Sequence, residues 1–81
     1  YKILGACNPP LALRALQAEP QVGLMLPCNV IVFERDDGTV HVSAIDPMQT
    51  VAAHGDAKLA AVAREVKEKL ERAMEHVAGA R

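Results

Sequence analysis

Aromatic residues are almost absent from this 81-residue chain, which has one Tyr, one Phe and no Trp. Proteins that hold single-stranded nucleic acid stack its bases on aromatic side chains, so the composition argues against that function. Basic residues are not in excess either: 9 Lys and Arg stand against 10 Asp and Glu, for a net charge of −1. Because binding to a phosphate backbone needs a basic surface, we expect no nucleic-acid partner.

Long apolar runs and cysteines are also scarce. No run approaches the roughly 18 apolar residues that a membrane span needs, and the first residues do not form a charged-then-apolar signal segment. We therefore expect no membrane partner. Two cysteines are too few for the disulfide framework of a small secreted domain. The composition indicates a cytoplasmic protein with reduced thiols.

Hydrophobic residues make up 51% of the chain, which is typical of a globular domain rather than a disordered one. With so few aromatics, the core must be aliphatic. A domain of this size buries only about 60% of the surface of its unfolded chain, so its stability is marginal. We expect residues 1–81 to form a single domain.

The first half of the chain predicts a strand, a helix and an extended segment. Residues 1–7 have the composition of a short strand, and Asn8 follows as a helix N-cap. The helix is expected over residues 11–19, with Leu13 and Leu16 on its apolar side. After a proline stop, alternating apolar residues predict an extended stretch over residues 22–26.

A β-hairpin is the clearest local prediction. Residues 29–35 and 39–45 flank Asp36-Asp37-Gly38, and Asp-Gly favours a two-residue type I′ turn. A loop of Asp37 and Gly38 would pair Phe33 with Val42, Ile31 with Ala44 and Glu34 with His41.

Two helix starts follow the hairpin. Asp46 is expected to cap a short helix, and Asp56 to cap a long one over residues 57–77. The long helix carries an apolar stripe of Leu59, Ala63, Val66, Leu70, Ala73 and Val77. Glu65 and Lys69 are spaced for an ion pair on its polar side. Such a helix covers the apolar face of a hairpin, or forms a dimer seam. The pattern predicts an α+β two-layer sandwich, with helices on one face of an antiparallel sheet.

The dipeptide Cys-Asn occurs twice and uses both cysteines, as Cys7-Asn8 and Cys28-Asn29. Cys7 precedes a predicted helix N-terminus, where the helix dipole favours a thiolate that could act as a nucleophile, a redox thiol or a metal ligand. The alternative is that both cysteines are small packing residues, since free Cys is often buried. Asn8 and Asn29 could donate hydrogen bonds to a ligand, or cap a helix and satisfy turn backbone.

If the fold brings the two thiols together, they form a paired-thiol site. Two thiolates could hold a soft ion such as Cu(I), or supply half of a tetrahedral zinc site. His54 is the candidate for a third metal ligand. The pair could instead cycle between dithiol and disulfide, although a reducing compartment disfavours a permanent disulfide.

Three motifs in order carry a resemblance to a known family: Gly5-Ala6-Cys7-Asn8-Pro9, Leu26-Pro27-Cys28-Asn29-Val30 and Ile45-Asp46-Pro47. Together they resemble domain-of-unknown-function family 302, found in bacteria and archaea. The resemblance implies a TATA-binding-protein-like α+β fold and association as a homodimer, and it implies no activity. Domains of that family normally begin with a strand and a helix before the position of Tyr1. The resemblance therefore implies that this chain is the carboxy-terminal portion of a slightly longer domain.

Three functions remain open at this point. The first is a binding module in which Cys7 and Cys28 take a soft metal or do redox chemistry. The second is a structural, homodimerisation or protein-interaction domain in which both cysteines pack. The third, an enzyme with Cys7 as nucleophile, ranks last because the sequence pairs no base with that thiol.

Overall fold

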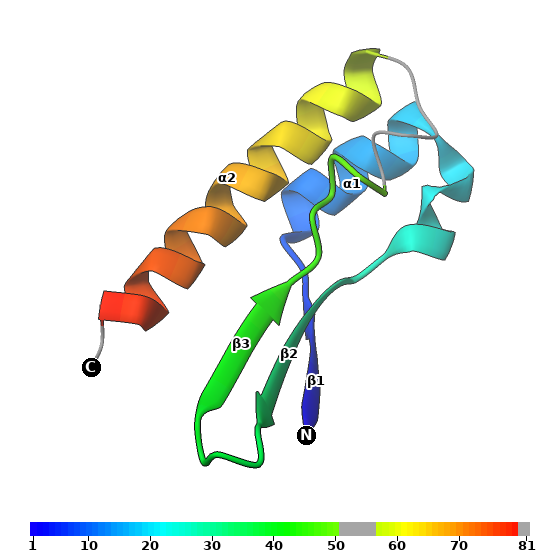
Figure 1. The fold of residues 1–81 in the computed structure, drawn as a ribbon. Helices are drawn as coiled ribbons and strands as arrows, with labels where there is room; N and C mark the ends of the chain where they lie inside the picture. The colour runs from blue at the N-terminus through cyan, green and yellow to red at the C-terminus, as the bar shows by residue number, and fades with distance from the viewer. Residues whose placement is uncertain (51–56, 80–81) are drawn as a thin grey trace.

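The computed structural model describes residues 1–50 and 57–79 of the chain. Along the sequence, the elements are β1 (Lys2–Ala6), α1 (Pro9–Ala18), the 3₁₀ helix η1 (Pro20–Met25), β2 (Cys28–Glu34), β3 (Val40–Ala44) and α2 (Ala57–Gly79). The strands form an antiparallel sheet in the order β1-β2-β3. The two α-helices lie side by side and the sheet extends from one end of the pair (Figure 1). The predicted α+β class with an antiparallel sheet is confirmed.

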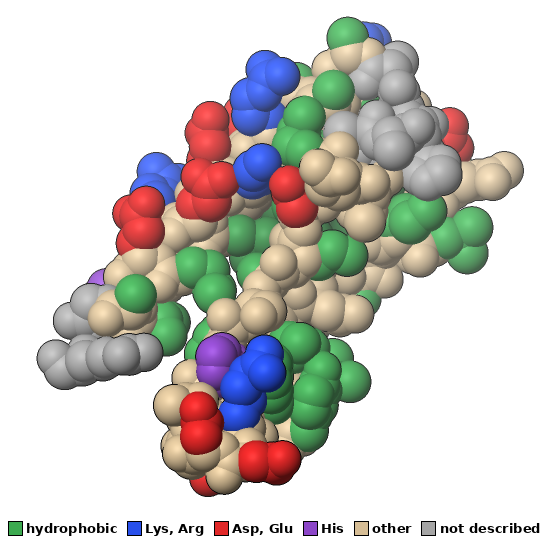
Figure 2. All heavy atoms as spheres, in the orientation of Figure 1, with side chains coloured by type: hydrophobic (Ala, Val, Ile, Leu, Met, Phe, Trp, Pro, Cys, Tyr) green, Lys and Arg blue, Asp and Glu red, His purple; other side chains and the backbone are tan. Residues whose placement is uncertain are grey.

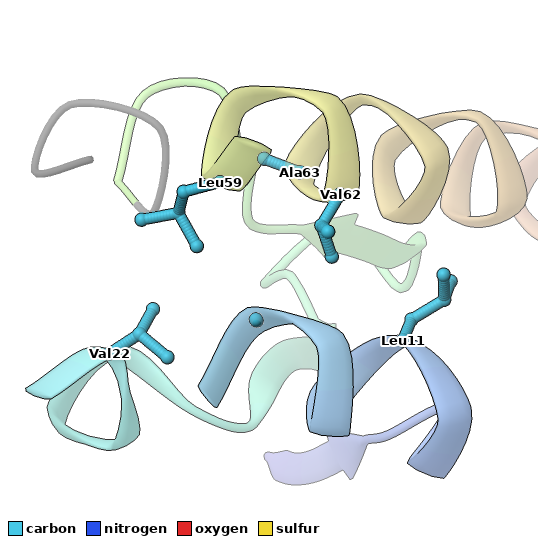
Figure 3. Close-up of a cluster of buried hydrophobic side chains, with 6 residues drawn as sticks. Leu11, Val22, Leu59, Val62 and Ala63 are labelled. Atoms are coloured by element: carbon cyan, nitrogen blue, oxygen red, sulfur yellow. The ribbon is translucent and has the colours of Figure 1, made fainter. Parts of the chain in front are cut away.

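The core lies between the helices (Figure 3). Its buried residues are Leu11, Ala15, Val22, Leu59, Val62 and Ala63. In the close-up, the side chains of Leu59 and Val62 on α2 point toward those of Val22 and Leu11 on η1 and α1. The predicted stripe of α2 is thus core in its first half, whereas Val77 near the helix end is 49% exposed.

The prediction for the buried side of α1 is wrong. Leu13 is 56% exposed and Leu16 is 38% exposed, whereas Leu11 and Ala15 are buried. Leu11 and Ala15 share one face at i, i+4 spacing. We attribute the choice of this face to its alanine, which lets α1 approach α2 closely.

Asn8 caps α1, as predicted: its side-chain Oδ1 accepts a hydrogen bond from Leu11 N at 3.2 Å. The extended segment predicted over residues 22–26 is wrong, because the chain forms η1 there. Glu19 caps η1 by accepting from Gln21 N at 2.9 Å, and Pro20 occupies the first turn. These two helix-start signals outweigh a short alternation of apolar residues.

The hairpin forms, but its register differs by one residue from the prediction. Arg35 N donates to Thr39 O at 2.8 Å and Gly38 N donates to Arg35 O at 2.9 Å, so the loop has three residues, Asp36 to Gly38. Only Gly38 takes a positive φ, of 85°, within the described chain. This is a type I turn closed by a left-handed glycine, not a type I′ turn. The observed pairs are Phe33 with His41, Ile31 with Ser43, Val32 with Val42 and Val30 with Ala44.

This register places a row of rings across the sheet. The rings of Tyr1 and Phe33 stack with centroids 5.6 Å apart, and those of Phe33 and His41 at 5.5 Å. The Arg35 guanidinium lies 5.4 Å from the Phe33 centroid. His41 therefore neighbours Phe33, and the expected facing pair of His41 with Glu34 is wrong.

Much of the sheet extends beyond the helices. Ile3 is 67% exposed, Leu4 51% and Val40 59%. Figure 2 shows hydrophobic side chains gathered on this part of the sheet, low in the view. The radius of gyration is 13.9 Å, against about 12 Å for a compact domain of this length. The helices thus cover only one end of the sheet.

Within the described residues, two partly exposed ion pairs join α2 to other segments of the chain. Arg14 of α1 pairs with Glu65 at 2.5 Å, and Lys67 pairs with Asp46 at 3.1 Å. Because Glu65 turns toward α1, the predicted pair of Glu65 with Lys69 does not form in the described chain. No helix within residues 1–50 and 57–79 is both long and apolar enough to cross a membrane.

Asp46 organises the turn that follows β3. Its Oδ1 accepts from Met48 N at 2.9 Å, and its backbone O accepts from Gln49 N at 3.0 Å. Residues 47–50 form a turn rather than a helix. The rest of the predicted short helix and the predicted cap Asp56 lie outside the described residues.

Candidate functional site

The two cysteines meet where the sheet joins the helices. Cys28 is the first residue of β2, and its register partner on β1 is Ala6. Cys7 comes directly after Ala6, just past the end of β1, so its backbone lies next to that of Cys28. Both cysteines are free, and both line one cavity of about 40 Å³.

This cavity is apolar and small. Besides the two cysteines, residues that line it include Leu11, Ala15, Pro27, Pro47, Val62 and Val66. A cavity of ~10–15 Å³ already admits one water molecule, so this one has room for an ion or a few atoms beside the thiols. Its walls come from β1, β2, both α-helices and the turn after β3.

The two thiols have different environments. Cys28 is only 5% exposed, whereas Cys7 is exposed. Burial raises the pKa of the Cys28 thiol, and the nearby charge of Cys7 raises that pKa further. Both causes make the thiolate form of Cys28 harder to reach.

Of the two asparagines, Asn8 lines the cavity and Asn29 faces away from it. Asn8 lines the cavity with Cys7, and its Oδ1 caps α1, which leaves its amide N–H groups for a ligand. Asn29 follows Cys28 in β2, so its side chain points to the other face of the sheet. Its backbone O accepts from Ile45 N at 3.1 Å. That Asn29 takes part in ligand binding stays a prediction.

A second hollow, of about 170 Å³, adjoins the first. Cys7, Asn8 and Cys28 line it as well, together with Lys69 of α2. Sequence reasoning placed Lys69 on the solvated side of the helix. The available signal was its position between Val66 and Leu70 of the apolar stripe, which puts Lys69 at the border of that stripe.

The described residues do not build a complete metal cage. Within residues 1–50 and 57–79, no group of three or more His, Cys, Asp or Glu side chains is placed to hold an ion. His54, the predicted third ligand, lies outside the described residues. What the structure brings together is therefore two thiols with an asparagine beside them.

A search of curated proteins found no match to this chain. The family described as "Domain of unknown function DUF302" matches residues 1–77. That match covers the strands, the helices except the last two residues of α2, and all three motifs that resemble the family. The chain therefore belongs to the DUF302 family.

Proposed function

We propose that this domain is a small binding module whose Cys7 and Cys28 hold a soft metal ion, in a reducing cytoplasm where both thiols stay reduced. The observation that carries the proposal is the placement of both cysteines on one small cavity. Cys7 and Cys28 line one cavity, and the charge of one raises the pKa of the other. Two packing cysteines would need neither this pairing nor the exposure of Cys7.

The ligand set favours Cu(I). Thiolates select soft ions, whereas a structural zinc site takes four ligands, and the described residues supply two. Metal binding displaces the proton from each thiol, so the ion would overcome the raised pKa of Cys28. The apolar walls of the cavity would limit the access of water to the ion on the side of Cys28.

Anaerobic titration of the purified protein with Cu(I), against a chromophoric competitor, tests the proposal. We expect one ion per chain, and loss of that binding in both Cys7→Ser and Cys28→Ser. The double variant Cys7→Ala plus Cys28→Ala should keep the circular dichroism spectrum of the wild type, which separates binding from folding. Wild type that takes up no metal and has two unreactive thiols would falsify the proposal.

If Cys7 and Cys28 serve redox chemistry instead of metal binding, they should form a disulfide with each other. A small-molecule disulfide RS–SR would oxidise the pair, so that Cys7 and Cys28 form one S–S bond while two RSH molecules leave with the two protons. Mass spectrometry would then show a chain lighter by two hydrogens. Wild type that forms this bond at a cytosolic glutathione potential, and binds no Cu(I), points to redox chemistry instead of metal binding.

The second candidate function is homodimerisation, which the uncovered sheet favours. Ile3 and Tyr1 are 67% and 79% exposed on the face that carries the row of rings. Apolar patches of this kind mark interaction sites. A second copy placed on this face would bury both patches about a two-fold axis.

Ultracentrifugation of matched variants tests this candidate. Ile3→Lys should turn a dimer into a monomer without unfolding the chain, because the side chain is exposed. Leu24→Lys is the control, since Leu24 is 84% exposed on η1, away from the sheet. A monomeric wild type, or equal loss of dimer in both variants, would count against the sheet as an interface.

A further inference from the structure

The hollow next to the thiol cavity combines a reactive group with a charge. Cys7 is exposed and lines this hollow of about 170 Å³. Its floor is apolar, formed by side chains that include Leu11, Val66 and Leu70. Lys69 is the only charged residue among the described residues that line it.

The ammonium group of Lys69 has no carboxylate partner in residues 1–50 and 57–79. Helical spacing offers it Glu65, one turn earlier. Glu65 instead pairs with Arg14 of α1. The pair between the two helices thus leaves Lys69, which lines the same hollow as the exposed Cys7, without its expected carboxylate partner.

The size of the hollow limits the ligand. An engineered protein cavity of about 150 Å³ holds benzene, so this hollow suits a molecule with few heavy atoms. An anionic group would lie at Lys69, short apolar atoms on the floor, and a sulfur at Cys7. The amide N–H groups of Asn8, which also lines the hollow, provide further hydrogen-bond donors.

We infer that this hollow binds a small thiol compound bearing a carboxylate, with its sulfur at Cys7 and its carboxylate at Lys69. The inference deepens the proposed function, because it uses the same Cys7 sulfur that the metal would. Metal and small thiol therefore compete for that sulfur. The ligand class is inferred from Lys69, the one cation among the described residues that line the hollow, and from the exposed thiol of Cys7.

The chemistry is a thiol–disulfide exchange with the disulfide form RS–SR of the compound. Cys7 loses its proton to solvent and its thiolate attacks one sulfur of RS–SR. The S–S bond breaks, a Cys7–SR bond forms, and the other RS⁻ leaves and takes a proton from water. No further oxidant is needed, because the incoming disulfide is itself reduced.

Rates with matched disulfides of different charge test the inference. Mixed-disulfide formation on metal-free protein is followed by mass spectrometry with dithiodipropionate (anionic), hydroxyethyl disulfide (neutral) and cystamine (cationic). We expect the anionic reagent to react roughly fivefold faster than the neutral one, the effect of one charge pair in water, with adduct on Cys7 alone. The net charge of the chain is −1, so long-range attraction would not produce this order.

Variants assign the preference to Lys69. Lys69→Gln should bring the anionic and neutral rates together, and Lys69→Glu should make the cationic reagent the faster one. Arg72→Gln is the control, because it removes an exposed cation of α2 that does not line the hollow. Equal wild-type rates for the three reagents, an adduct elsewhere than Cys7, or equal effects of Arg72→Gln and Lys69→Gln would overturn the inference.

The Cu(I) titration on the same proteins keeps the two proposals apart. If Lys69→Gln binds Cu(I) like wild type and loses the preference for the anionic disulfide, the metal site and the small-thiol ligand are both supported. Wild type that binds Cu(I) but shows no charge preference overturns only the small-thiol ligand. Wild type that prefers the anionic disulfide but binds no Cu(I) overturns only the proposed metal site.

Discussion

Pro27 lies directly against Gly5: a Cβ atom added to Gly5 would come within 2.9 Å of Pro27 Cγ. Real Cβ atoms do not approach other atoms so closely, and a proline ring cannot rotate away. This contact joins β1 to the start of β2, where Ala6 pairs with Cys28. The glycine and the proline therefore pack against each other next to the two cysteines.

Gly5→Ala should destabilise the protein by about 1–3 kcal/mol, the usual cost of overpacking. Urea denaturation would show this as a lower midpoint at unchanged slope. Gly23→Ala is the matched control, since its new Cβ would meet only Leu16 Cδ2 at 3.8 Å, an ordinary contact. Equal midpoints for the two variants would show that Pro27 gives way without cost.

Gly38→Ala should also destabilise the protein, by about 1–2 kcal/mol, because Gly38 has φ of 85° and a Cβ disfavours that conformation. Open space surrounds the position, so strain of the backbone is the only expected cause. Gly38→Asn should cost less, since Asn tolerates positive φ. If urea denaturation shows that Gly38→Asn destabilises the protein as much as Gly38→Ala, the positive φ of Gly38 is not the cause of the destabilisation.

The hairpin also illustrates what local sequence can and cannot predict. Asp37-Gly38 identified the turn, and Asn8 identified the start of α1, because both signals act within a few residues. The same Asp-Gly fits a two-residue or a three-residue loop, so the register stayed ambiguous. A shift of one residue exchanges the faces of all partners, and this is why Phe33 meets His41 instead of Val42.

The core and the site depend on contacts distant in sequence. Packing against α2 decides which face of α1 is buried, and Leu13 and Leu16 indicated the wrong face. The repeated Cys-Asn suggested paired thiols, and the pairing of β1 with β2 brings Cys7 and Cys28 to one cavity. Lys69 lines the hollow beside them, and its expected partner Glu65 pairs with Arg14 instead.

The stability contributed by Asp46 should depend on pH. The hydrogen bond from Met48 N and then the one from Lys67 hold the pKa of Asp46 below its ordinary value. A carboxyl with a lowered folded pKa stabilises the protein above the unfolded pKa, of about 3.9, and loses this effect as the pH falls through the folded pKa. Asp46→Asn should therefore lower the urea midpoint at pH 7, and the difference from wild type should shrink below about pH 4.

The variant Lys67→Met separates the two causes of the lowered pKa of Asp46, the hydrogen bond from Met48 N and the interaction with Lys67. It removes the ion pair of Asp46 and keeps the bond from Met48 N, so we expect a smaller loss at pH 7 than for Asp46→Asn. A difference between wild type and Asp46→Asn that stays constant from pH 7 to low pH would contradict the assigned pKa.

The two thiols should differ in reactivity in the folded protein. Cys7 is exposed, whereas burial raises the pKa of Cys28 and removes it from solvent. Because the thiolate is the reacting form, iodoacetamide should alkylate Cys7 at least about tenfold faster, measured by peptide mass spectrometry. In urea the two rates should converge. Cys7→Ser removes the charge that further raises the pKa of Cys28, so Cys28 should react somewhat faster in that variant, whereas a slower reaction would contradict the electrostatic link between the two sulfurs.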